Sequence, residues 1–100
     1  MTPFQTAIQE ALELLRYGEV VTYGEIAAQS GYPGAARAVG NVLRNSSGLP
    51  WWRVVASDGR LVPGLEIEQE RRLRAEGIQV IEGRVAKSPV GNVRQQEGQS

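Results

Sequence analysis

Residues 21–45, VTYGEIAAQSGYPGAARAVGNVLRN, decide the fold of this 100-residue chain. Within them, Thr22 and Glu25 form a Thr-x-x-Glu capping box, which predicts a short helix from Tyr23 to about residue 30. The turn-forming sequence Gly-Tyr-Pro-Gly at 31–34 separates it from a second helix, which we predict over 35–45. Two short helices joined by a turn that contains glycine are typical of a helix-turn-helix.

The second of these helices has two different faces. Its apolar stripe, which we expect to pack on the core, consists of Ala35, Val39, Val42 and Leu43. The opposite face combines very small residues with arginine and asparagine: Ala36, Arg37, Gly40, Asn41 and Arg44. Glycine inside a helix costs about 1 kcal/mol relative to alanine, so the close approach of another molecule would account for Gly40. Packing of this face on the core is the weaker explanation, because the apolar stripe lies on the other side.

The flanking segments complete a mainly helical domain with a few short strands. Upstream, a capping box of Thr2 and Gln5 predicts a helix that ends near Tyr17. Downstream, strands at 53–56 and 60–62 are predicted to form a hairpin around Ser-Asp-Gly. A hairpin at this place is the wing of a winged helix-turn-helix, and that is the fold class we predict.

The C-terminal part of the chain changes character after residue 87. Before it, the pattern predicts a helix over 65–76 and a pair of strands at 78–81 and 84–85. After it, the residues are polar with scattered glycine and proline. We expect one domain over residues 1–87 and a flexible polar tail over 88–100.

Composition excludes several kinds of site. The chain contains no cysteine and no histidine, which excludes thiolate nucleophiles and the commonest zinc ligands, so we expect no metal and no cofactor. A net charge of +0 argues against a strong non-specific binder of nucleic acid. However, residues 31–60 hold four arginines against one acidic residue, whereas residues 1–30 hold one arginine against four glutamates. Such a basic band fits a local surface that faces phosphate, although chance also produces bands of this size.

The segment 49–55, LPWWRVV, carries the chemical information. It resembles the active-site motif Pro-Cys-His-Arg-Val of the O6-alkylguanine-DNA alkyltransferases, in which the cysteine thiolate takes the alkyl group from a damaged guanine. Supporting matches are 21–27 (VTYGEIA), 35–40 (AARAVG) and 57–59 (SDG). Trp51 stands at the cysteine position and Trp52 at the histidine position, and an indole cannot act as a thiolate. The chain is therefore similar to the alkyltransferase-like proteins, which bind alkylated guanine without repairing it.

The resemblance implies roles for residues of the helix-turn-helix. The family's match to Arg37 enters the base stack in place of a nucleotide that is rotated out, and a planar guanidinium suits that place. The match to Tyr23 helps to turn the nucleotide out and contacts its phosphate. Ala36 and Gly40 would let this helix enter the minor groove, which is about 6 Å wide. The implied DNA-binding surface is Tyr23, Ala36, Arg37, Gly40, Asn41 and Arg44. Without the resemblance, Arg37 would be an ordinary surface arginine and Tyr23 a half-buried tyrosine.

The implied lesion pocket consists of Tyr23, Asn45, Ser46, Trp51, Arg53, Val54 and Arg60. Trp51 would give an alkylated purine a flat wall, and stacking on an aromatic side chain contributes about 1–3 kcal/mol per base. If the segment is extended, the indoles of Trp51 and Trp52 point to opposite sides. The loop 62–64 lacks the Gly-Tyr-x-Gly-Gly pattern of active transferases, so the preferred alkyl group stays open. Glu76 either pairs with Arg53 or is a simple helix-end carboxylate, and we favour the second.

These expectations combine into a non-enzymatic sensor of O6-alkylguanine in duplex DNA. It would bind through the minor groove, flip the base into a pocket and mark the site for nucleotide excision repair, a partnership that the resemblance alone implies. The alternative is a winged-helix transcriptional regulator that reads undamaged DNA in the major groove with Arg37, Asn41 and Arg44. An enzyme acting on the flipped base is disfavoured, because only Glu76 or Asp58 would be available as its base.

The remaining expectations concern the state and place of the protein. No apolar run approaches the length of a membrane span, and the first residues lack a secretory signal pattern. We therefore expect no membrane partner and a cytoplasmic location, associated with the nucleoid if the protein is bacterial. We also expect a monomer.

Overall fold

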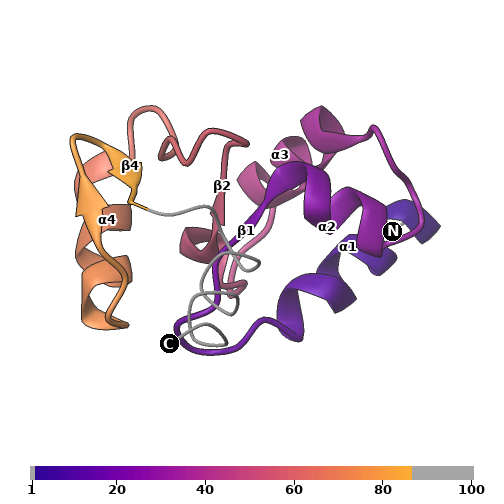
Figure 1. The fold of residues 1–100 in the computed structure, drawn as a ribbon. Coiled ribbons are helices and arrows are strands. Elements are labelled where there is room, and N and C mark those ends of the chain that lie inside the picture. The colour runs from indigo at the N-terminus through magenta and orange to yellow at the C-terminus, as the bar shows by residue number, and fades with distance from the viewer. Residues whose placement is uncertain (1, 87–100) are drawn as a thin grey trace, which may run out of the picture.

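The computed structural model describes residues 2–86 and arranges them in two lobes joined by a short strand pair (Figure 1). The N-terminal lobe contains α1 (Pro3–Glu13), α2 (Tyr23–Gln29) and α3 (Ala36–Arg44). The C-terminal lobe contains α4 (Glu66–Ala75) and an antiparallel hairpin of β3 (Val80–Ile81) and β4 (Arg84–Val85). Between the lobes lie β1 (Val21–Thr22), the 3-10 turn η1 (Trp51–Arg53) and β2 (Val54–Val55). The predicted tail over 88–100 falls outside the described residues.

Both predicted capping boxes are confirmed. Thr2 Oγ1 accepts a hydrogen bond from the Gln5 backbone N–H at 3.1 Å, and Gln5 Oε1 accepts one from the Thr2 N–H at 2.9 Å. At the start of α2, Thr22 and Glu25 make the same reciprocal pair at 3.0 and 2.8 Å. These bonds satisfy amide groups that a helix start otherwise leaves without partners, so the sequence placed both helix starts correctly.

The first helix ends earlier than predicted, at Glu13 instead of near Tyr17. Its last turn tightens, because the N–H groups of Leu14 and Leu15 bond three residues back instead of four. Leu15 is then buried in the core, and its carbonyl accepts a hydrogen bond from Arg53 at 3.1 Å. The bond from Arg53 satisfies a carbonyl that a helix end leaves without an intrahelical partner, so it fits a chain that has left the helix before Leu15.

The predicted hairpin of 53–56 with 60–62 is wrong as a strand pairing. The turn itself forms, closed by a hydrogen bond from the Ala56 N–H to the Arg60 carbonyl at 3.0 Å. The strand before it instead pairs in parallel with β1, with Val54 opposite Val21, and both valines of β2 are fully buried. Residue 60 makes only an isolated bridge to Arg84. The reason is that an apolar strand buried on both faces is best satisfied inside the molecule.

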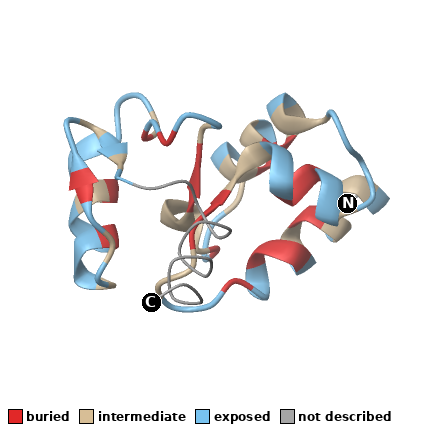
Figure 2. Cartoon of the chain, in the orientation of Figure 1, coloured by how far each residue is buried: buried red, intermediate tan, exposed pale blue. Residues whose placement is uncertain are grey.

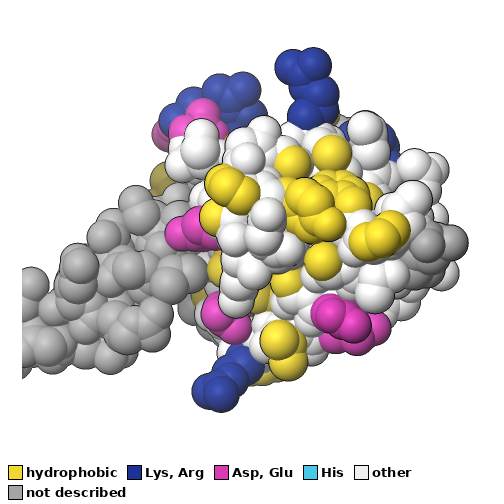
Figure 3. All heavy atoms as spheres, turned by 90° about the vertical axis from the view of Figure 1, so that its right-hand side faces the viewer, with side chains coloured by type: hydrophobic (Ala, Val, Ile, Leu, Met, Phe, Trp, Pro, Cys, Tyr) yellow, Lys and Arg dark blue, Asp and Glu magenta, His cyan; other side chains and the backbone are white. Residues whose placement is uncertain are grey.

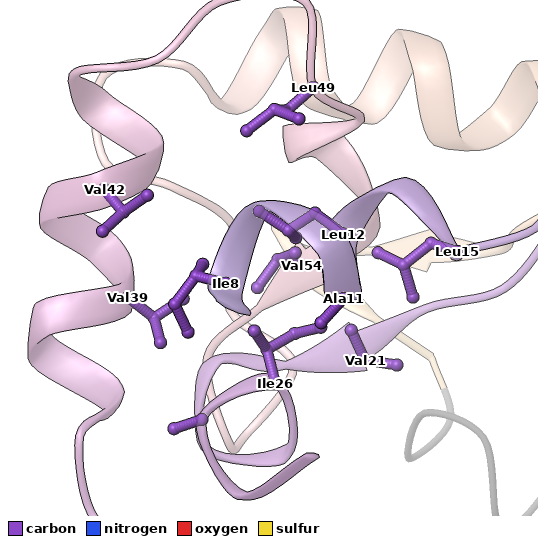
Figure 4. Packing of buried hydrophobic residues seen from close by; sticks show 11 residues of the cluster. Ile8, Ala11, Leu12, Leu15, Val21, Ile26, Val39, Val42, Leu49 and Val54 are labelled. Carbon is purple, nitrogen blue, oxygen red and sulfur yellow. The ribbon is translucent and has the colours of Figure 1, made fainter. Parts of the chain in front are cut away.

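Each lobe has its own hydrophobic cluster, and buried residues occur in the helices of both lobes and in the strand pair between them (Figure 2). The cluster of the N-terminal lobe, shown in Figure 4, includes Ile8, Leu12, Ile26, Val39 and Val54. That of the C-terminal lobe consists of Val20, Val55, Leu61, Leu73 and Val80. The strand β2 contributes to both clusters, because its neighbouring residues Val54 and Val55 face opposite sides. None of the helices within residues 2–86 is long and apolar enough to cross a membrane.

The face seen at the right of Figure 1 gathers hydrophobic side chains at its centre and charged side chains near its edge (Figure 3). Among the aromatic residues, Tyr32 is partly exposed in the turn between α2 and α3. Its ring meets that of Phe4 edge-on, with centroids 4.8 Å apart. This contact ties the helix-turn-helix to α1, so the orientation of α3 is fixed from within the lobe.

Candidate nucleic-acid interface

The outer face of α3 and the start of α2 form a shallow hollow of about 340 Å³. It is lined by Tyr23, Ala36, Arg37, Gly40 and Arg44. The hollow exists because Val39 and Val42 turn inward to the core, which leaves the small residues of the opposite face outward. The structure thus brings together five of the six residues that were predicted to bind DNA. The sixth, Asn41, is exposed on α3 and accepts a hydrogen bond from Arg44.

The cationic groups of this face are not neutralised within the part of the chain that the structure describes. Arginines elsewhere in the lobes mostly pair with carboxylates, as Arg60 does with Asp58 at 3.2 Å and Arg74 with Glu70 at 2.7 Å. Among residues 2–86, Arg37 and Arg44 have no acidic side chain within ion-pair distance. Arg37 is also exposed. The face therefore offers two positive charges to an anionic partner.

Tyr23 is held between this face and the core. Its ring is half-buried and packs against the N-terminal cluster, and a methyl group built on Gly40 would come within 4.0 Å of the ring. Burial raises the pKa of the Tyr23 hydroxyl above its ordinary value, and nearby Arg44 lowers it in part. The phenol is therefore neutral at physiological pH and remains able to donate a hydrogen bond.

Residues Trp51–Arg53 form a 3-10 turn, so the condition under which the two indoles would point to opposite sides, an extended segment, is not met. The rings of Trp51 and Trp52 meet edge-on, with centroids 6.2 Å apart. Trp52 packs on the C-terminal cluster, and its Nε1–H donates to Glu76 Oε2 at 2.8 Å. Trp51 is half-buried and lies outside the hollow on α3. Of the two indoles, Trp52 is thus the one anchored in the core.

Glu76 pairs with Arg53, so the simple helix-end carboxylate that we favoured is wrong. Oε2 accepts from Arg53 Nη2 at 2.8 Å and Oε1 from Arg53 Nε at 3.0 Å, with the two side chains 13% and 6% exposed. Oε1 also accepts from the Gly18 N–H at 2.7 Å. Burial raises the pKa of Glu76, but the bonds from Arg53, Gly18 and Trp52 outweigh it and leave the pKa below its ordinary value. The carboxylate is held as an anion at neutral pH.

The other predicted pocket residues are placed apart from the hollow. Asn45 and Ser46 bond to the last carbonyls of α3, through Asn45 Nδ2 to Asn41 O at 2.9 Å and Ser46 Oγ to Val42 O at 2.7 Å. Arg53 is engaged with Glu76, and Val54 is fully buried. Arg60 is exposed and paired with Asp58. Of the predicted pocket, only Tyr23 lines the hollow, and the others stay predictions.

No group of three or more acidic side chains suited to a metal ion occurs among residues 2–86.

Two residues of α4 that were not predicted as functional hold the turn η1 (Trp51–Arg53), which we call the tryptophan turn. The Arg72 guanidinium carbon lies 4.8 Å from the centroid of the Trp52 ring, a cation–π contact. Gln69 is fully buried and bonds to the carbonyls of Trp52 and Val54, both at 3.1 Å. With Glu76 they lie at spacings of three and four residues, which places them on one side of the helix end. That spacing was visible in the sequence, but the abundant charges of α4 concealed it.

Fold and site together define a helix-turn-helix domain of the winged-helix type, with its outward helix free for a partner. The sequence model of the 6-O-methylguanine DNA methyltransferase DNA-binding domain matches residues 3–78. This chain belongs to that family.

Similar proteins fall into two groups. A DNA base-flipping protein of Vibrio parahaemolyticus is 44% identical over 92 residues, which cover 86% of this chain and 92% of the relative. The structure also matches the crystal structure of S. pombe Atl1 in complex with damaged DNA containing O6-carboxymethylguanine, with a TM-score of 0.75 and 35% identity over 81% of this chain and 82% of that chain. The second group contains transferases.

A methylated-DNA–protein-cysteine methyltransferase of Mycobacterium leprae represents the transferases. It is 47% identical over 66 residues, which cover 61% of this chain but only 39% of the relative. The likeness to the transferase therefore concerns part of a longer protein, whereas the likeness to the base-flipping protein extends over nearly all of it. This chain contains no cysteine.

Proposed function

We propose that this protein is a non-enzymatic sensor of O6-alkylguanine in duplex DNA. It binds through the minor groove, flips the damaged base out of the stack and marks the site for nucleotide excision repair. Support comes from the family, from relatives described as base-flipping proteins, and from the similar structure that was solved with damaged DNA. The partnership with excision-repair proteins follows from the resemblance to the alkyltransferase-like proteins.

The observation that carries the proposal is the composition of the hollow on α3. Ala36 and Gly40 leave its floor without bulky side chains, while Arg37 projects from it as an exposed cation. The minor groove is about 6 Å wide, so a helix enters it only where its side chains are small. A regulator that reads base edges in the major groove would need long polar side chains in these places.

Arg37 then has a specific part in the mechanism. A base turned out of the duplex leaves a gap and costs a few kcal/mol of stacking and pairing. The planar guanidinium of Arg37 fills the gap and bonds the orphaned partner base. Tyr23, beside it at the start of α2, keeps its phenol proton and donates to the phosphate of the rotated nucleotide.

The absence of an alkyl acceptor makes the complex lasting. The chain contains no cysteine, and Trp51 stands where the alkyltransferase motif has its thiolate. The two carboxylates that an enzymatic mechanism would need, Glu76 and Asp58, are each paired with an arginine. The lesion therefore stays bound and chemically unchanged, as expected for a protein that marks damage and not for a repair enzyme. We also propose that the protein acts as a monomer. Its place is with the DNA, which in a bacterium means the nucleoid in the cytoplasm.

A titration of fluorescently labelled duplexes tests the proposal. One duplex carries a single O6-methylguanine and the other carries guanine at the same position, and salt is held constant because phosphate contacts depend on it. We expect clearly tighter binding of the modified duplex, with the modified base recovered intact after incubation. Equal affinity for the two would refute the sensor. Tight binding of one undamaged sequence would point to a transcriptional regulator, and loss of the alkyl group or the base would point to an enzyme.

A further inference from the structure

Gln69 is the only polar residue among residues 2–86 that is 0% exposed. It lies in the middle of α4, a helix otherwise rich in exposed charges. All of its polar atoms are engaged: Nε2 donates to two carbonyls, and Oε1 accepts from the Val62 N–H at 2.7 Å. A buried amide is costly unless it is bonded, so these three bonds explain how the residue is tolerated at this place.

The partners of Gln69 belong to two separate segments. The carbonyl of Trp52 lies in η1, the turn that carries Trp51, and that of Val54 lies at the start of β2 directly after it, whereas Val62 begins the loop that leads to α4. One side chain thus sets the separation between the tryptophan turn and this loop. Two nearby residues also hold Trp52: Arg72 of α4 makes a cation–π contact with its ring, and Glu76, which caps α4, accepts a hydrogen bond from its indole N–H.

We propose that Gln69 is a positioning residue of the lesion-binding site and that its bridge determines how large an alkyl group the site accepts. This inference rests on the proposed function, since it assumes that Trp51 faces the damaged base. The glutamine itself touches no DNA. Without its two donated bonds, the carbonyls of Trp52 and Val54 lose their partner and the turn shifts to find others. A site whose supporting contacts are loosened by about 1 Å loses discrimination before it loses its fold.

The test compares Gln69→Met, which keeps the length of the side chain without its hydrogen bonds, with Val80→Ala. The control removes core volume from the same lobe, in a residue that is 3% exposed and makes no side-chain hydrogen bond to the turn. Three duplexes are titrated, carrying guanine, O6-methylguanine or O6-benzylguanine. For Gln69→Met we expect the preference for lesion over guanine to fall on the order of tenfold. The difference in affinity between the O6-methylguanine and O6-benzylguanine duplexes should also become smaller, while the affinity for the undamaged duplex stays the same.

Each outcome is informative. If the unaltered protein binds the three duplexes equally, the sensor itself is refuted and the role of Gln69 falls with it. If it prefers lesions and Gln69→Met keeps both the preference and the size ranking, as Val80→Ala should, the glutamine is structural only and the inference alone is overturned. If Gln69→Met lacks a cooperative thermal transition, the comparison uses Gln69→Asn, which keeps the amide but shortens its reach. The preference for lesion over guanine and the size ranking of that variant then decide the question in the same way.

Discussion

Replacing Gly40 by alanine separates the stability of the free protein from its fit to DNA. A methyl group built on Gly40 would lie 3.8 Å from Arg44 Nη1 and 4.0 Å from a ring carbon of Tyr23, both ordinary contacts. The helix therefore accepts alanine without a clash and gains about 1 kcal/mol from its higher helix propensity. For a domain of this size, that gain corresponds to a rise in Tm of about 4–8 °C.

The effect on DNA binding should have the opposite sign. The added methyl projects into the hollow, which on the proposed function faces the narrow minor groove, and we expect the affinity for lesion duplex to fall about tenfold, or about 1.4 kcal/mol. Gly24→Ala is the matched control, because Gly24 is also helical and its nearest neighbour would be Thr22 Oγ1 at 3.9 Å. Thermal melts and duplex titrations measure both quantities. A raised Tm with unchanged affinity would refute the close approach, and a lowered Tm would show that Gly40 is needed for packing.

Two further predictions concern charged residues. Arg37→Ala should weaken binding of the lesion duplex at least tenfold and change the free energy of unfolding by less than about 0.5 kcal/mol. Arg16→Ala replaces another arginine without an acidic partner among residues 2–86 and should leave both the affinity and the stability nearly unchanged; equal losses of affinity would indicate a general charge effect. Glu76→Gln should cost about 3 kcal/mol at neutral pH because it leaves Arg53 without a counter-charge. Since the pKa of Glu76 is lowered by folding, its ionised form stabilises the fold above pH ~4.5, the usual range of a glutamate, and this stabilisation is lost as the pH falls through the lower folded pKa. Urea unfolding at several pH values should therefore show the unaltered protein and the variant converging in acid, and a constant difference would contradict the ion pair.

Local signals made much of the fold predictable. The hydrogen bonds at Thr2 and Thr22 depend on residues three positions away, so the sequence shows them directly. The hairpin of β3 and β4 was predicted for the same reason, since its strands are separated only by Glu82 and Gly83. The outer face of α3 was predictable because helical spacing alone decides which residues share a side.

Contacts between distant segments could not be predicted in the same way. Arg53 and Glu76 are 23 positions apart, and the sequence does not show that the end of η1 meets the residue that follows α4. Val54 finds its partner Val21 on a parallel strand and not on the adjacent turn, because both valines of β2 must be buried. Much of the proposed lesion pocket depends on such contacts, so its residues stay predictions, whereas helical spacing alone brings those of α3 onto one face.

The neighbouring indoles of η1 also have a practical use. Trp51 and Trp52 are the chain's two tryptophans, so its tryptophan fluorescence originates from a single location. Emission and quenching therefore report on that turn alone, without a label, and any ligand that reaches it should be visible to a spectrometer.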